Sequence, residues 1–357
     1  MKEMLNEKNT IQLMRGLAII SVVMFHALSV LPLGVGLQQV NSINNVVGMS
    51  IFYILSGYVF EISYSKYRSI GFGKFAKRKI LRLGVPYLSY SILLYAIVVC
   101  ANMIPQISAI LQNTEYHRVS IVEILKAIVL FQNHIGIHLW FIVCLLIITL
   151  LNYFYEPKRI VLEFIVSIVL SCVLRNWIDS TLLFRVVFYY PFFICGRIIR
   201  IAISRHFYSL RCIKYAKYGG IISAIVFLSM SLCRPYVNSI AIPGYDLLIR
   251  FLRYGNYMAI GVCGTYIVFL LTTFILSHSE RISNQIIGVG NDSYAIYLLH
   301  QPFIAPPVAI LIYSIANSIL VATLMSTLLG ILIPIVLTKH ILLRSNILSC
   351  CLLGRRK

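Results

Sequence analysis

Charged residues are scarce in this chain of 357 residues. Only 12% of the residues are Asp, Glu, Lys or Arg, and the 11 acidic residues are outnumbered by 31 basic ones. A soluble globular domain carries about 25% charged residues. This shortage, together with a hydrophobic fraction of 59%, excludes an ordinary soluble domain and predicts a membrane protein.

Long polar stretches are also missing, so no soluble domain fits between the apolar segments. Segments of about 20 apolar residues, enough to cross a hydrocarbon layer of about 30 Å, recur from Ile11 almost to the C-terminus. We expect an all-α polytopic membrane protein of about ten transmembrane helices, forming one domain at 11–343 between a leader (1–10) and a basic tail (344–357). Because the first apolar segment lacks a small-residue cleavage site, it is predicted to be a retained helix. The expected spans are 11–31, 43–61, 83–104, 136–155, 160–177, 183–203, 218–233, 256–277, 291–313 and 319–343.

Signatures of metal sites and of internal repeats are absent as well. The nine cysteines include no CxxC pair, and they are most simply small core residues. His134 and His138 have a spacing that can hold a metal, but no third ligand is apparent, so no metal is expected. The sequence shows neither an internal repeat nor the paired Gly/Pro-broken spans that are typical of many carriers.

The basic residues are unevenly distributed along the chain. Most of the 31 lysines and arginines fall in segments that the expected spans place on the same side of the membrane as the N-terminus, above all in 66–82, 197–217 and 339–357. Short loops rich in Lys and Arg remain in the cytoplasm, which predicts that both termini are cytoplasmic. Topology therefore explains most of the net charge of +20, and nucleic acid is not an expected partner.

Two ionisable residues, Arg15 and His26, interrupt the first apolar segment, MRGLAIISVVMFHALS (14–29). An ionisable side chain at the bilayer centre costs about 3 kcal/mol or more. On a helix the two residues share one face and stand about 16 Å apart along the axis. They indicate a polar path inward from the cytoplasm. Alternatively, Arg15 extends to lipid phosphates and His26 hydrogen-bonds a neighbouring helix.

Five stretches together resemble the signatures of acyltransferase family 3. They are RGLAIISVVMFH (15–26), SIFYILSGYVF (50–60), FAKRKILRLGVP (75–86), HLWFIVCLL (138–146) and GNDSYAIYLLHQPF (290–303). Members of that family are bacterial ten-helix membrane enzymes that move acetyl or other short acyl groups from cytoplasmic acyl-CoA to cell-envelope carbohydrates. The resemblance extends from residue 11 to about residue 313.

The resemblance implies an inner-membrane O-acyltransferase, most simply an O-acetyltransferase. Its donor substrate would be acetyl-CoA, without a permanently bound cofactor, and its other partners would be membrane lipid and a glycan. That glycan would be a capsular polysaccharide, an O-antigen, an exopolysaccharide or a lipid-linked precursor. Two alternatives stay open: a non-enzymatic glycan carrier or flippase, and an acyltransferase with another donor such as succinyl-CoA.

The basic stretch FAKRKILRLGVPY (75–87) suits the phosphates of such a donor. Arg78 and Arg82 are four residues apart, so on an α-helix they project from one face, and guanidinium groups bind phosphate oxygens in a fork. We expect Lys77, Arg78 and Arg82, with Arg15, to bind the donor. The alternative is an ordinary basic loop that holds the helix in register.

The stretch DSYAIYLLHQP places three polar residues on one face of the expected ninth span. Ser293, Tyr297 and His300 follow the spacing i, i+4, i+7, and the depth of His300 could bring it toward His26. We expect Ser293 and Tyr297 to contact substrate. An interhelical hydrogen-bond ladder is the alternative.

The stretch HLWFIVCLL is expected to form the acceptor-side rim, through His138 and Trp140. Many family members carry a glutamate here and this chain does not. The acidic group that would orient His26 is therefore not identified by the sequence.

His26 is the expected general base for the acyl transfer, and His300 is the second candidate. An imidazole with a reference pKa near 6.5 can take a proton from the acceptor hydroxyl, which contributes about 10²–10⁴-fold to the rate. Alternatively, His26 carries the acyl group itself.

Overall fold

The structure is a computed structural model that describes residues 7–112, 120–131, 133–174, 181–206 and 211–354. The described residues form helices and no strands, which confirms the all-α prediction. Because lipid offers the backbone no hydrogen-bond partners, helices that satisfy their own N–H and C=O groups are the expected solution.

Seven helices in the described residues are long and apolar enough to cross a membrane. The predicted count of ten is therefore not confirmed, and the structure does not test the predicted orientation. The seven are α1 (Glu7–Leu28), α2 (Val35–Ile62), α4 (Phe72–Lys79) continued through a π-helical turn (Ile80–Gly84) into α5 (Val85–Asn102), α10 (Thr181–His206), α11 (Arg211–Ser239), α12 (Asp246–His278), and α16 (Ile319–Leu337) continued by a π-helical turn (Thr338–Leu342).

The remaining helices are shorter. Two of them, α8 (Trp140–Leu151) and α15 (Ala305–Ala316), are apolar along their length. A 3₁₀ turn at Ile137–Leu139 precedes α8, and another at Pro157–Arg159 precedes α9 (Ile160–Val173). The shorter α-helices are α3 (Tyr64–Ser69), α6 (Pro105–Leu111), α7 (Ile121–Val129), α8 (Trp140–Leu151), α9 (Ile160–Val173), α13 (Glu280–Asn291), α14 (Ser293–Leu299), α15 (Ala305–Ala316) and α17 (Asn346–Leu353).

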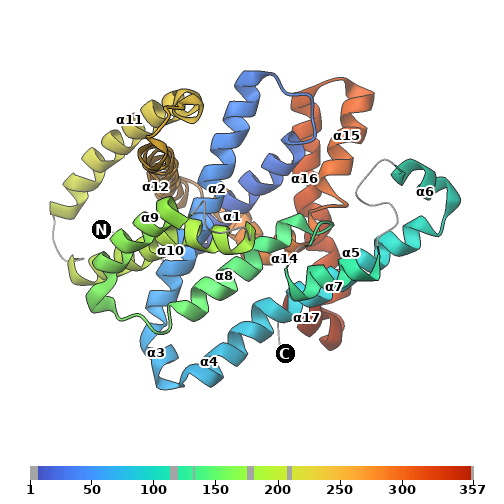
Figure 1. Cartoon of the computed structure of the whole chain (residues 1–357), viewed down its shortest axis with the longest axis horizontal. Coiled ribbons are helices and arrows are strands. Elements are labelled where there is room, and N and C mark those ends of the chain that lie inside the picture. Colours follow the sequence, from blue (N-terminus) through green and yellow to red (C-terminus); the bar gives the residue numbers. More distant parts are fainter. Residues whose placement is uncertain (1–6, 113–119, 132, 175–180, 207–210, 355–357) are drawn as a thin grey trace.

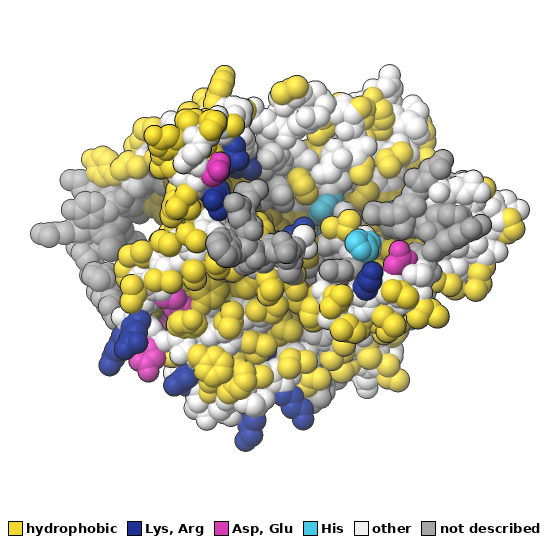
Figure 2. Space-filling model, in the orientation of Figure 1, with side chains coloured by type: hydrophobic (Ala, Val, Ile, Leu, Met, Phe, Trp, Pro, Cys, Tyr) yellow, Lys and Arg dark blue, Asp and Glu magenta, His cyan; other side chains and the backbone are white. Residues whose placement is uncertain are grey.

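Helices α1 and α2 occupy the middle of the molecule (Figure 1). Helix α1 packs against α2, α13 and α16, and α2 packs in turn against α10 and α12. Many large hydrophobic side chains are nevertheless exposed. Figure 2 shows them over most of one face, with several Lys and Arg side chains along the lower edge. Lipid contact explains this surface, because exposed apolar area of this extent is unusual in a soluble monomer.

The predicted single span 291–313 is wrong, because the chain turns between His300 and Ala305 and divides it into α14 and α15. Prolines explain the division: Pro302 lies in the turn, and Pro306 lies in the first turn of α15. A proline has no backbone N–H and clashes with a preceding helical turn, whereas the first turn of a new helix accepts it. His300 is therefore placed at the C-terminal end of a short helix rather than inside a long one.

The predicted tail, 344–357, begins with an ordered helix. Helix α17 starts at the N-cap Ser345, whose hydroxyl accepts a hydrogen bond from the Leu348 backbone N–H at 3.3 Å. It packs against α5, the helix that follows the π-helical turn with Arg82. The last three residues of the predicted tail, and residues 1–6 of the predicted leader, lie outside the described residues.

Two glycines allow α2 and α10 to cross in backbone contact. A Cβ atom on Gly57 would lie 1.8 Å from the Phe193 carbonyl oxygen, and one on Gly196 would lie 1.9 Å from the Ile54 carbonyl oxygen. Small residues are enriched at membrane helix contacts because they permit this approach. The crossing fixes the position of α10, which carries residues of both cavities described below.

We predict that Gly57→Ala destabilises the protein by at least about 1–3 kcal/mol, the cost of overpacking a close contact. Gly255→Ala in α12 is the matched control, since no atom lies within 4 Å of its added Cβ and alanine favours a helix by up to about 1 kcal/mol. Thermal unfolding of the purified protein in detergent measures both variants. Equal unfolding temperatures for Gly57→Ala and Gly255→Ala would contradict the close crossing.

Candidate active site

Three histidines from distant parts of the sequence meet in the interior. His26 comes from α1, His138 from the 3₁₀ turn before α8, and His300 from the end of α14. The ring centroids of His26 and His300 are 5.2 Å apart, and those of His138 and His300 are 5.8 Å apart. The predicted approach of His300 to His26 is confirmed, and His300 lies between the two other rings.

The hydrogen bonds of His300 determine which ring nitrogen carries the proton. Its Nδ1 donates to the carbonyl oxygens of Ile296 at 2.9 Å and Tyr297 at 2.8 Å. In a neutral imidazole the other nitrogen is then an acceptor. That atom, Nε2, is buried and has no hydrogen-bond partner among the described residues. His300 thus holds an unused acceptor lone pair next to His26.

His138 lies inside this cluster and not on a rim, which corrects its predicted position. Its side chain is 5% exposed, and its Nε2 donates to the Leu298 carbonyl oxygen at 3.4 Å. The Tyr297 hydroxyl donates to the backbone carbonyl of His138. Tyr297 is itself buried against both imidazoles, so it links α14 to the turn before α8.

His26 is partly exposed, unlike His138 and His300. The titratable groups that face it in the described residues are His300 and His138, and no carboxylate is among them. The acidic partner that the sequence left unidentified is therefore not found in the described part of the chain. Of the two histidines with metal-like spacing, His134 lies in an exposed bend. Within the described residues no group of three or more His, Cys, Asp or Glu side chains has an arrangement that could hold a metal ion, and this includes the three clustered histidines.

Arg15 lies on the same helix as His26, close enough to Arg82 for the two charges to repel. Neither has a carboxylate within 4.0 Å among the described residues. Lys77 and Arg78 are exposed on α4. The π-helical turn begins after α4, so the four-residue spacing from Arg78 to Arg82 does not have α-helical geometry, and their predicted common face is not established by it.

Two other predicted contact residues are Ser293 and Trp140. Ser293 is buried at the first position of α14. The Trp140 ring contacts two side chains of α10: the Arg185 guanidinium carbon lies 4.4 Å from its centroid, and the Tyr189 ring stacks on it at 5.4 Å. A cation over an aromatic face is stabilising, so this stack fixes α8 against α10.

The structure also contains a buried ion pair that the sequence analysis missed. Arg197 was counted only among the basic residues of the cytoplasmic side, but it lies in α10, is fully buried and donates from Nε to Glu61 Oε2 at 2.8 Å. Its Nη1 donates to Asn152 Oδ1 at 2.9 Å and lies 4.0 Å from Glu163 Oε2. The overlooked signal was the position of all three charged residues within expected spans, where ionisable groups are rare and paired.

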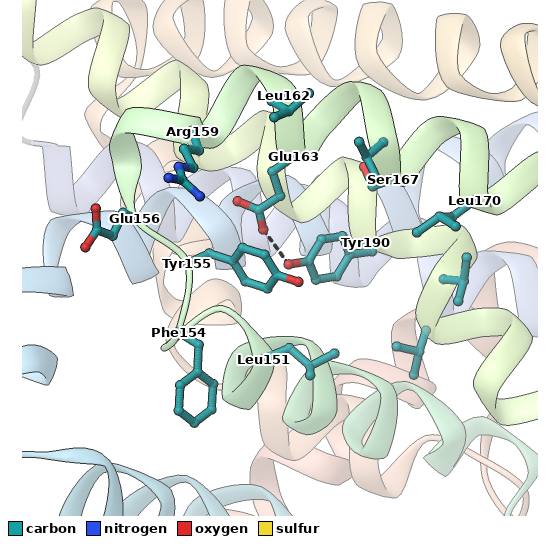
Figure 3. A pocket seen from close by; sticks show the side chains of 13 residues that line it. Leu151, Phe154, Tyr155, Glu156, Arg159, Leu162, Glu163, Ser167, Leu170 and Tyr190 are labelled. Carbon is teal, nitrogen blue, oxygen red and sulfur yellow. Dashed lines mark hydrogen bonds between the residues drawn. The ribbon is translucent and has the colours of Figure 1, made fainter.

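Glu163 also borders a cavity of about 690 Å³ between α8, α9 and α10. The Tyr190 hydroxyl donates to its carboxylate, as the dashed line in Figure 3 shows. Figure 3 also shows Glu156 and Arg159 at one end of this cavity, and the rest of the lining is mostly leucine, valine and aromatic side chains. The cavity holds none of the three clustered histidines, so we assign the buried ion pair a structural role in joining α2, α9 and α10.

The model of a family described as an acyltransferase domain matches residues 8–339 of the chain. Comparison with curated proteins and with solved structures gives no match. The family match covers nearly the whole chain and includes His26, His138, His300, Arg15 and Arg82. The chain therefore belongs to acyltransferase family 3, and it is a membrane acyltransferase.

Proposed function

We propose that this protein is an O-acetyltransferase of the bacterial inner membrane. It takes an acetyl group from cytoplasmic acetyl-CoA and transfers it to a sugar hydroxyl of a capsular polysaccharide, an O-antigen, an exopolysaccharide or a lipid-linked precursor. The observation that carries this proposal is the meeting of His26, His138 and His300 inside a helix bundle of the acyltransferase family. An imidazole cluster in an apolar interior is suited to proton transfer.

The donor phosphates bind at Arg15 and Arg82 in this proposal. Two neighbouring cations without a carboxylate partner repel each other, and an anionic ligand relieves that repulsion. Guanidinium groups bind phosphate with two parallel hydrogen bonds. Arg15 and His26 lie on the same helix, about 16 Å apart along its axis. In this proposal a long donor arm held by its phosphates at Arg15 runs along α1 to the histidines, and Lys77 and Arg78 add positive charge at its start.

The reaction in this proposal begins at His26, the partly exposed histidine. His26 takes the proton of the acceptor hydroxyl as the oxygen attacks the thioester carbonyl. The C–O bond forms, the C–S bond breaks, and the CoA thiolate leaves and receives the proton. The unpartnered Nε2 of His300 is the acceptor available to stabilise the protonated His26. In an alternative order, His26 first takes the acetyl group and then passes it to the hydroxyl.

Purified protein with labelled acetyl-CoA tests the proposal against its alternatives. Release of CoA with transfer of label to a glycan, or with slow hydrolysis, supports an acetyltransferase. Glycan movement without CoA release would support a carrier and overturn the proposal. Faster release of CoA from succinyl-CoA than from acetyl-CoA would replace the proposed donor.

We predict that Arg15→Ala and Arg82→Ala each raise the KM for acetyl-CoA by about tenfold or more. A hydrogen bond to a charged group contributes about 1.5–3 kcal/mol, and the loss of binding without loss of chemistry appears in KM. Lysine at either position restores binding only in part, because it keeps the charge and loses the fork. Arg281→Gln, at an exposed position of α13, controls for net charge. A rise in the KM for acetyl-CoA in Arg281→Gln equal to that in Arg82→Ala would contradict the donor site.

We also predict that His26→Gln reduces turnover to less than about a tenth of the wild-type value, a barrier change above 1.4 kcal/mol, without loss of donor-analogue binding. Glutamine keeps hydrogen-bonding capacity and loses the titratable ring. A structural hydrogen bond between membrane helices averages only about 0.6 kcal/mol, so a purely structural His26 would leave most of the activity. Steady-state kinetics measure the turnover, and a non-hydrolysable acetyl-CoA analogue measures donor binding. Turnover of His26→Gln above about a tenth of the wild-type value would contradict the assignment of His26 as the base and make His300 the next candidate.

A further inference from the structure

A second, smaller cavity of about 320 Å³ lies between α9, α10, α11 and α12. Three arginines line it, Arg234 from α11 and Arg250 and Arg253 from α12, together with Tyr254 and Tyr257. The sequence-based topology places these arginines on the side of the membrane opposite the donor-binding arginines. No step of the proposed chemistry uses them.

The three positive charges are not balanced within the described part of the chain. None of the arginines lies within 4.0 Å of a carboxylate there. Three cations around one cavity repel one another, and in a partly buried place that repulsion is weakly screened. The arrangement therefore favours an anion.

Two of the arginines also hold the framework of the cavity. Arg253 Nη2 donates to the carbonyl oxygens of Asn238 at 2.9 Å and Ile240 at 2.6 Å, at the end of α11. Arg250 Nη1 donates to the Cys172 carbonyl oxygen at 3.2 Å, near the end of α9. These bonds satisfy carbonyl groups that a helix end leaves without partners, and they hold both guanidinium groups in place.

Arg234 differs from these two because no ion pair and no backbone carbonyl holds it in the described residues. Its guanidinium carbon lies 5.4 Å from the ring centroid of Tyr257, and its side chain is partly exposed. A stacked guanidinium keeps its in-plane N–H groups free to bind an oxyanion. Arg234 is thus the side chain most available to a ligand.

A continuous series of aromatic contacts joins this cavity to the histidine cluster. The hydroxyl oxygens of Tyr257 and Tyr189 are 3.0 Å apart, and the Tyr189 ring stacks on Trp140 at 5.4 Å. From Trp140 the ring contacts continue through Phe141 and Tyr297 to His138. Aromatic rings with polar edges suit a ligand that presents both apolar and hydroxyl faces, and a saccharide is such a ligand.

We propose that this arginine-lined cavity binds an acidic group, a carboxylate or a phosphate, of the acceptor saccharide. The identification of the saccharide as the acceptor substrate rests on the proposed function, whereas the anion site itself rests on the three arginines. The acidic group anchors one end of the saccharide at Arg234, and the aromatic series from Tyr257 to Trp140 leads the remaining sugar units toward His26. The enzyme then prefers acidic to neutral glycans.

Binding of defined probes to the purified full-length protein in detergent tests this site. The probes are a uronic acid tetrasaccharide, its carboxyl-reduced neutral counterpart, and inorganic diphosphate. We expect at least one anionic probe to bind about tenfold more tightly than the neutral one, since each hydrogen bond to a charged group contributes at least that factor. The uronic acid and diphosphate arms distinguish a sugar carboxylate from a carrier phosphate.

Arg234→Gln should remove that preference, Arg234→Lys should restore it in part, and Lys126→Gln on α7 should leave it unchanged as a control for charge. Equal binding of all three probes by the wild-type protein, or an unchanged preference in Arg234→Gln, would overturn the proposal. Should the Arg234 variants fail to fold, phenylglyoxal modification of the wild-type protein replaces them. In that experiment the preferred anionic probe should protect Arg234 and the neutral probe should not, and equal protection would overturn the site.

The outcome for the proposed function is read separately, from CoA release by the same wild-type preparation. Anion preference without any CoA release from acetyl-CoA would leave the arginine site standing and would contradict the acetyltransferase. CoA release without anion preference would support the acetyltransferase and would contradict the arginine site. The two claims can therefore fail independently.

Discussion

The hydrogen bonds from His300 Nδ1 to the carbonyl oxygens of Ile296 and Tyr297 are the constraint on which the candidate site depends. A buried polar group without a partner is costly, so these bonds make a fully buried imidazole tolerable. They also leave Nε2 as a buried acceptor without a hydrogen-bond partner in the described residues. They form at the C-terminal end of α14, where the prolines after His300 stop the helix.

Charge is distributed in this bundle according to whether it has a partner. The buried Arg197 is paired with Glu61 and bonded to Asn152, which suits a structural role, because an unpaired buried charge would be strongly destabilising. Arg15, Arg82 and Arg234 have no carboxylate within 4.0 Å in the described residues. These three arginines are residues at which anionic substrates are proposed to bind.

The sequence predicts the elements of this structure better than their junctions. Apolar length alone identifies the long helices, and helical spacing places Arg15 and His26 on one helix. The division at His300 was missed because a hydropathy pattern does not register where prolines redirect an apolar segment. The burial of His138 and the pairing of Arg197 with Glu61 depend on contacts between helices distant in sequence, which helical periodicity does not predict.

The site residues show the same limit. The approach of His300 to His26 was expected from depth in the membrane, and the structure confirms it. The orientation of His300 by two backbone carbonyl oxygens was not predicted, since the sequence raised only an acidic partner for His26. Backbone partners have no sequence signature, since every residue carries a carbonyl group.

The most direct test of the central claim is an experimental structure of the protein with a non-hydrolysable acetyl-CoA analogue. We expect the phosphates of the analogue at Arg15 and Arg82, and its acetyl group beside His26 and His300. Binding of the analogue in the cavity bordered by Glu163 and Tyr190, with the three histidines left without ligand, would contradict the account.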